Sequence, residues 1–190
     1  MLSCKEVILH HLILNKFYTT IQMKKPEIII VDDHQIFRQG IKSIITLENI
    51  ATVVGVATNG EELLQLLTTT KPDIVLLDID MPAMNGLEAT EKALKLYPDL
   101  KIIAFTMFGD EEYFVRMIEL GAVGYILKSS DISELEKTIR IVMKGDKYFS
   151  NPQFKKETNY PGFREIKKLT KPEGHAISNK NNADLFPQLF

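Results

Sequence analysis

Five short apolar runs, each followed by a segment with helical periodicity, occupy the middle of the chain. The apolar runs lie at 27–33, 51–58, 73–80, 101–108 and 122–128, and the helical segments at 35–48, 61–70, 86–97, 111–121 and 133–145. Strands that are apolar nearly throughout and separated by helices indicate a parallel sheet covered on both faces. The sequence therefore predicts a doubly wound α/β domain with a five-stranded parallel sheet. Asp131 and Glu134 are typical of a capping box at the last helix.

The composition argues against several other classes of protein. Among 190 residues, 23 Lys and Arg face 25 Asp and Glu, so the chain lacks the positive excess of a typical nucleic-acid binder. A single cysteine, Cys4, cannot form an internal disulfide or a multi-cysteine zinc site, which favours a reducing cytoplasm. No apolar run reaches the roughly 18 residues of a membrane span, and His10 and His11 interrupt the stretch 7–14. We expect a cytoplasmic protein without a membrane span.

Polar side chains lie at the end of four of the five apolar runs. They are Asp32 and Asp33 at the end of the first run, Asp78 and Asp80 at the end of the third, Thr106 near the end of the fourth and Lys128 at the end of the fifth. Right-handed crossovers place the carboxyl ends of parallel strands at one edge of the sheet, where such folds bind ligands. We therefore expect these side chains to lie close together.

The chemistry of this group suits phosphoryl transfer. Several carboxylates from two strand ends make an oxygen-rich pocket for a hard divalent cation, and Mg²⁺ is the expected ion. Aspartyl-phosphate formation needs a nucleophilic oxygen, a metal and fixed donors for the phosphoryl oxygens. Asp78, Mg²⁺, Thr106 and Lys128 would supply them.

Each residue also has an ordinary structural explanation. Asp32 or Asp33 taken alone could be the N-cap of the following helix, and Asp80 could form a turn. Thr106 could be a strand residue bonded to backbone, and a lone Lys128 is most often a solvated charge. Specificity comes from their combined placement at the ends of successive strands.

Together these motifs resemble the receiver domain of bacterial response regulators, the flavodoxin-like phosphoacceptor module of two-component signalling. The resemblance covers residues 24–146. It rests on IIIVDDH at 28–34, VLLDIDMPAMNG at 75–86, IIAFT at 102–106 and GAVGYILK at 121–128, in the order and spacing of such domains. It implies a signalling protein rather than an enzyme, with at most self-phosphorylation from small donors and self-dephosphorylation.

The resemblance implies a role for each acidic residue. Asp78 would be the phosphoacceptor, receiving a phosphoryl group from a sensor histidine kinase or a phosphotransfer protein. Asp33 and Asp78 would bind Mg²⁺ through their carboxylates, Asp32 would assist directly or through water, and Asp80 would contribute its backbone carbonyl. The resemblance leaves a homodimer open.

The resemblance also implies a conformational switch. Lys128 would pair with the phosphoryl group and Thr106 would hydrogen-bond to it. Tyr125 falls at the position of the family's aromatic switch, which turns inward as the threonine moves toward the phosphate; the alternative is a half-buried strand tyrosine. The sequence departs from the pattern at Ser129, where many receivers have proline after a cis peptide.

Both ends of the chain extend beyond the receiver pattern. Met23 opens a typical receiver start, so we expect residues 1–22 to be an N-terminal extension. This extension is either the product of a misassigned start codon or a helical apolar segment that packs on a neighbour. The receiver domain is expected at 23–146 and a polar linker at 147–168.

Residues 169–190 resemble parts of the helix-turn-helix domain of LuxR/FixJ-type regulators. The matches lie at 169–171 and within 178–186, but Pro172 and Gly174 weaken a helix interior. A recognition helix that reads bases in the major groove does not follow. We expect a short irregular tail, the truncated or degraded remnant of that domain, with no assigned DNA-binding residue. A functional DNA-binding transcriptional regulator is the alternative.

Two other functions compete with this interpretation. Asp78 and Asp80 also form a D-x-D motif, as in haloacid-dehalogenase-type phosphatases, where the second acid protonates the leaving group. Those enzymes carry the motif on their first core strand and need a further acidic pair downstream, whereas Asp32 and Asp33 lie upstream. A nucleotide or flavin binder has little support, because VDDHQIF contains no glycine-rich phosphate cradle.

Overall fold

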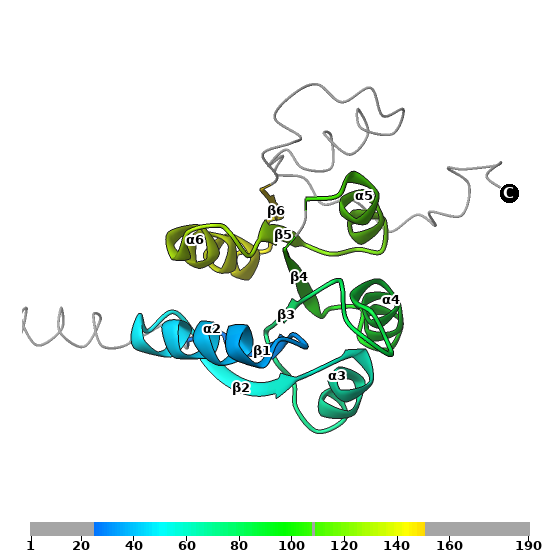
Figure 1. Ribbon diagram of the computed structural model, residues 1–190, viewed down its shortest axis with the longest axis horizontal. Helices are drawn as coiled ribbons and strands as arrows, with labels where there is room; N and C mark the ends of the chain where they lie inside the picture. Colours follow the sequence, from blue (N-terminus) through cyan, green and yellow to red (C-terminus); the bar gives the residue numbers. More distant parts are fainter. Residues whose placement is uncertain (1–24, 108, 151–190) are drawn as a thin grey trace, which may run out of the picture.

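The computed structural model describes residues 25–107 and 109–150, arranged as Figure 1 shows. In chain order the elements are β1 (Glu27–Val31), α2 (Gln35–Leu47), β2 (Thr52–Ala57), α3 (Gly60–Leu67), β3 (Ile74–Leu77), α4 (Gly86–Leu96), β4 (Lys101–Thr106), α5 (Glu111–Glu119), β5 (Gly124–Leu127), α6 (Ile132–Met143) and β6 (Tyr148–Phe149). Within these ranges no helix has the length and apolar character needed to cross a bilayer. The predicted extension 1–22, most of the linker 147–168 and the tail 169–190 lie outside the described residues.

The strands form one parallel sheet in the order β2-β1-β3-β4-β5-β6. From β1 the chain forms β2 on one side, then returns past β1 to form β3 and the strands beyond it. This reversal creates a topological switch point between β1 and β3, where folds of this class bind ligands at the carboxyl ends of the strands. The predicted doubly wound α/β fold is confirmed.

Helices cover both faces of this sheet. Figure 1 shows α2 and α6 on one face and α3, α4 and α5 on the other. Because alternate residues of a strand point to opposite faces, Val75 and Leu77 of β3 join the core beneath α3, α4 and α5, whereas Ile74 and Leu76 join the core beneath α2 and α6. Burial on both faces explains why β3 is apolar at every position.

The sheet has a sixth strand, whereas the sequence predicts five. β6 pairs parallel with β5, with Tyr148 opposite Gly124 and Phe149 opposite Tyr125. The Phe149 ring packs edge-on against Phe114 of α5, with 6.1 Å between the ring centroids. Tertiary packing of two aromatic residues therefore adds the start of the predicted linker to the sheet, where no local strand pattern signals it.

The capping box predicted at Asp131 and Glu134 is wrong. Asp131 is the N-cap residue of α6, but its side chain makes no capping hydrogen bond. The Glu134 carboxylate instead accepts a hydrogen bond from the Tyr148 hydroxyl at 3.2 Å. Ser130 and Ser150 also donate hydrogen bonds to this carboxylate, so residues before α6 and at the end of the described chain compete with the helix end for it.

Candidate functional site

Three strand ends position the polar residues of the candidate site. Asp32 directly follows β1, Asp78 follows β3 and Lys128 follows β5. Backbone hydrogen bonds continue beyond the strands, from the Asp78 amide to the Val31 carbonyl at 2.9 Å and from the Lys128 amide to the Thr106 carbonyl at 2.8 Å. The hydrogen bonds of the sheet therefore fix the backbone positions from which these side chains extend.

Lys128 lies buried between two aspartates. Its Nζ is 2.6 Å from Oδ2 of Asp78 and 2.7 Å from Oδ2 of Asp32, and the lysine side chain is only 1% exposed. The same Nζ lies 4.6 Å from the ring centroid of Phe37. Lys128 is thus no solvated charge, because it compensates two buried carboxylates. Its peptide bond to Ser129 is trans, since the described residues contain no cis peptide.

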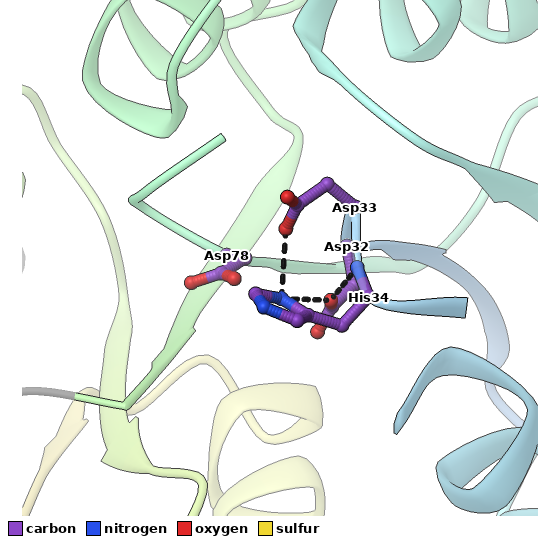
Figure 2. Close-up of side chains that lie close together, drawn as sticks. All are labelled: Asp32, Asp33, His34 and Asp78. Carbon is purple, nitrogen blue, oxygen red and sulfur yellow. Dashed lines mark hydrogen bonds and ion pairs between the residues drawn. The ribbon is translucent and has the colours of Figure 1, made fainter. Parts of the chain in front are cut away.

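Asp32, Asp33, His34 and Asp78 form a compact group of metal-ligating side chains. One ligand atom from each residue lies within 4.8 Å of the others. Figure 2 shows the four side chains close together. Oδ1 of Asp33 is buried, and Nδ1 of His34 lies 2.9 Å from it. A buried carboxylate oxygen calls for a positive partner, and carboxylates suit hard divalent cations. The residues present therefore fit a divalent metal.

The structure does not support Asp32 and Asp33 as helix N-caps. The N-cap residue of α2 is His34, and its side chain makes no capping hydrogen bond. Oδ1 of Asp32 accepts a hydrogen bond from the His34 amide at 2.8 Å. Sequence reasoning missed His34 as a member of this group, although its position directly after two aspartates is the signal that could have found it.

Burial raises the pKa of Asp78 above its ordinary value, and the charge of Asp32 adds to this effect. The hydrogen bond and the charge of Lys128 act in the opposite direction. A raised pKa means that the protein without a metal disfavours the ionised form of this carboxyl group. Because a single lysine faces several carboxylates, a divalent cation would restore the balance of charge.

The other predicted site residues lie outside this group. Thr106 is buried at the end of β4. The side chain of Asp80 is exposed and lies outside the four-residue group, which leaves its backbone carbonyl for the predicted role. Tyr125 of β5 is fully buried, and its ring packs edge-on against Phe114 with 5.0 Å between centroids. Burial, and to a lesser degree the charge of Asp110, raises the pKa of Tyr125. Tyr125 therefore faces the core.

Gly86 is a second residue of the site that sequence reasoning missed. A Cβ atom at Gly86 would lie 2.2 Å from the Asp78 carbonyl oxygen and 2.7 Å from Cα of Ile79. The Gly86 amide also donates a hydrogen bond to the Ile79 carbonyl at 2.8 Å. Only glycine lets the first turn of α4 approach the end of β3 so closely. Gly86 therefore fixes the backbone that carries Asp78.

Comparisons with known proteins agree on one family. The family model described as the response regulator receiver domain matches residues 28–140. The chain is 39% identical over 124 residues to the transcriptional regulatory protein DegU of Brevibacillus brevis, which covers 65% of this chain and 52% of that protein. It is 37% identical over 138 residues to the response regulator GacA of Pseudomonas syringae pv. syringae (strain B728a), covering 73% of this chain and 64% of that protein.

A solved structure gives the same result. A two-component response regulator of the LuxR family from Aurantimonas sp. SI85-9A1 matches with a TM-score of 0.65 and 33% sequence identity, over 70% of this chain and 94% of that chain. The chain nevertheless spans less than two thirds of the length of either curated relative named above.

Proposed function

The chain belongs to the response regulator receiver domain family, and on this premise we propose that Asp78 accepts a phosphoryl group from a sensor histidine kinase or a phosphotransfer protein. Receiver domains are the signalling modules of two-component systems. The observation that carries the proposal is the buried Asp78 carboxylate, which lies 2.6 Å from Lys128 and within ligand distance of Asp32 and Asp33.

The metal in this proposal is Mg²⁺. Asp33 and Asp78 would hold it through their carboxylates, Asp32 would assist directly or through water, and the backbone carbonyl of Asp80 would complete the protein's share. When bound, the ion supplies charge neutralisation for the phosphoryl oxygens. The burial of Asp33 Oδ1 and the surplus of carboxylates over lysines support this assignment.

Each residue of the site has a separate role in phosphoryl transfer. A carboxylate oxygen of Asp78 forms a bond to phosphorus, and the phosphorus–nitrogen bond of a phosphohistidine breaks, with its electron pair returning to the imidazole. Lys128 offers its ammonium group to a phosphoryl oxygen, and Thr106 offers its hydroxyl. Because Lys128 is held by its backbone at the end of β5, its charge is in place before transfer begins.

Thr106 and Tyr125 would convert the new charge into a change of surface. Movement of Thr106 toward the phosphoryl group opens space beside the Tyr125 ring, and the surface of α5, β5 and α6 responds. A nearly complete population change requires phosphorylation to favour the active state by about 5 kcal/mol. If phosphorylation changes the surface of α5, β5 and α6 equally in Tyr125→Ala and in the wild type, this switch assignment is wrong.

The output of the whole protein rests on residues outside the described ranges. DegU is named a transcriptional regulatory protein, so we propose that this chain derives from a LuxR/FixJ-type transcriptional regulator whose helix-turn-helix segment at 169–190 is degraded by Pro172 and Gly174. Sequence-specific DNA binding by the chain is the alternative, and a salt titration with specific and nonspecific DNA distinguishes the two. The lone Cys4 supports placement in the cytoplasm.

Intact mass spectrometry after incubation with acetyl phosphate and Mg²⁺ tests the proposal. We expect the chain to gain one phosphoryl group, and we expect no gain in Asp78→Asn or without Mg²⁺. Asp73→Asn is the matched control. Asp73 lies directly before β3, at the end of the strand opposite to Asp78, and its carboxylate accepts a hydrogen bond from the Glu27 amide at 2.8 Å. Turnover of an aryl phosphate would instead favour the phosphatase.

A further inference from the structure

His34 brings a nitrogen atom to an otherwise oxygen-only group. Figure 2 shows its imidazole turned toward the carboxylates of Asp32, Asp33 and Asp78. Nδ1 of His34 lies 2.9 Å from Oδ1 of Asp33 and 3.5 Å from Oδ1 of Asp32. The imidazole nitrogen thus lies at the distance from Asp33 that is typical of an ion pair or of two ligands of one ion.

This spacing is that of two neighbouring ligands of one ion. Two ligand atoms that lie about 2.1 Å from one ion are separated by about 3 Å at right angles and by about 3.4 Å in the tetrahedral arrangement that Zn²⁺ prefers. The distances from His34 Nδ1, of 2.9 Å to Asp33 Oδ1 and 3.5 Å to Asp32 Oδ1, lie close to these two separations. The backbone of His34 is anchored by the hydrogen bond from its amide to Asp32, while its side chain is 65% exposed. The ring is therefore fixed at its base and free to approach an ion.

Nitrogen and oxygen donors select different cations. Imidazole suits Zn²⁺, Co²⁺ and similar transition ions, whereas Mg²⁺ prefers oxygen and gains little from a ring nitrogen. A pocket with one imidazole and several carboxylates has the donor set of a zinc site as well as the donor set of a magnesium site. The two kinds of ion would share the same aspartates.

We propose that His34 is a ligand for Zn²⁺ in the acidic pocket, so that Zn²⁺ competes with Mg²⁺ at the phosphorylation site. This inference deepens the proposed function, on which its regulatory consequence rests. Zn²⁺ held by His34 and the aspartates excludes Mg²⁺ and lowers the extent of phosphorylation of Asp78. His34 therefore determines which divalent cation the receiver accepts.

Calorimetric titration with Zn²⁺ and with Mg²⁺ tests this role in the full chain without any phosphodonor. The background protein carries Cys4→Ser, His10→Gln, His11→Gln and His175→Gln, because these residue types also bind zinc. His34 is then the only histidine, since the chain has four. Its imidazole nitrogen resonances report ligation directly, independently of any activity.

We expect His34→Asn in this background to weaken Zn²⁺ binding by about tenfold or more and to change Mg²⁺ binding by less than about twofold. The Nδ1 resonance of His34 shifts on addition of Zn²⁺ and not on addition of Mg²⁺. Asp33→Asn is the matched control and weakens both ions, because it removes a shared carboxylate.

Equal Zn²⁺ affinity with and without His34 overturns the proposal. Equal losses for Zn²⁺ and Mg²⁺ also overturn it, because His34 would then shape the pocket rather than bind the ion. Zn²⁺ binding through His34 in a chain that acetyl phosphate does not label leaves the ligand assignment intact and refutes the proposed phosphorylation instead, so the two failures are distinguishable.

Discussion

The interior of the sheet and its carboxyl edge are equally buried but opposite in chemistry. In β3 the residues Ile74–Leu77 are at most 1% exposed, and the next residue, Asp78, is only 3% exposed. Burying apolar side chains stabilises the fold by about 25 cal/mol per Å². Burying a carboxylate costs free energy unless it is paired. A single peptide bond therefore separates Leu77, whose burial stabilises the fold, from Asp78, whose burial costs free energy.

The difference shows where function resides in this molecule. The two cores beneath the helices hold the strand ends in register. At the carboxyl edge, Asp32, Asp78 and Lys128 are therefore held together as buried ion pairs, although each charge alone would favour contact with water. Local rules of folding are expected to fail at such sites. Changes in the interior should therefore alter stability first, whereas changes at the edge should alter charge balance and chemistry first.

Lys128→Met should have the largest effect on stability. It leaves Asp32 and Asp78 buried without their lysine, so we expect the free energy of unfolding in EDTA to fall by about 3 to 5 kcal/mol. Added Mg²⁺ should restore more stability in this variant than in the wild type. Urea unfolding with and without Mg²⁺ measures both effects, and an unchanged midpoint in EDTA would show that the ion pair contributes nothing.

Leu76→Ala tests the interior two residues before Asp78. Leu76 is 1% exposed in the core beneath α2 and α6, so its truncation should lower the free energy of unfolding by about 2 to 5 kcal/mol. While folded, the variant should still gain one phosphoryl group from acetyl phosphate. Loss of labelling in a folded Leu76→Ala protein would contradict the separation between interior and edge.

Asp78→Asn should change stability by less than about 1 kcal/mol and abolish phosphorylation. Lys128 keeps its partner Asp32 at 2.7 Å, so no charge is left unpaired. An asparagine oxygen can still accept from the Ile79 amide, which now donates to Asp78 Oδ1 at 2.8 Å. Comparison with Leu76→Ala in the same urea titration isolates the edge, and a loss as large as that of Leu76→Ala would contradict the account.

Glu134→Gln should have the smallest effect, of about 0.5 kcal/mol at pH 7. Hydrogen bonds from Ser150, Ser130 and Tyr148 lower the pKa of Glu134 below 4.5, the opposite of the shift at buried Asp78. Because the pKa of Glu134 is lower in the folded protein, its ionised carboxyl group stabilises the fold above the unfolded pKa, and this stabilisation is lost as the pH falls through the folded pKa. The difference in free energy of unfolding between Glu134→Gln and the wild type should therefore be smaller at pH 3 than at pH 7. A constant difference would refute this.

Long-range periodicity made the fold predictable. Runs of Ile and Val separated by helical segments reflect burial on both faces of the sheet, and strand ends are where such folds place polar residues. Asp32, Asp78 and Lys128 could therefore be found from the sequence. Their pairing could not, because it depends on how far each side chain reaches across the edge.

The remaining features depend on contacts between distant residues. β6 has only two residues, and its aromatic packing against α5 leaves no local pattern. Glu134 is drawn to Tyr148, which no capping rule anticipates. Gly86 is needed because α4 lies so close to the Asp78 carbonyl that a Cβ atom would not fit. His34 joins the site because its ring turns toward the aspartates. The approach of α4 leaves no signal in the sequence, and the position of His34 directly after two aspartates does not show which way its ring turns.

Mapping the phosphorylated residue tests the role of Asp78 as phosphoacceptor. Borohydride reduction of an aspartyl phosphate converts that aspartate to homoserine, which peptide mass spectrometry locates after treatment with acetyl phosphate and Mg²⁺. The account predicts homoserine at position 78 and at no other aspartate. Homoserine at position 32 or 33, or a complete absence of homoserine in the folded protein, would contradict it.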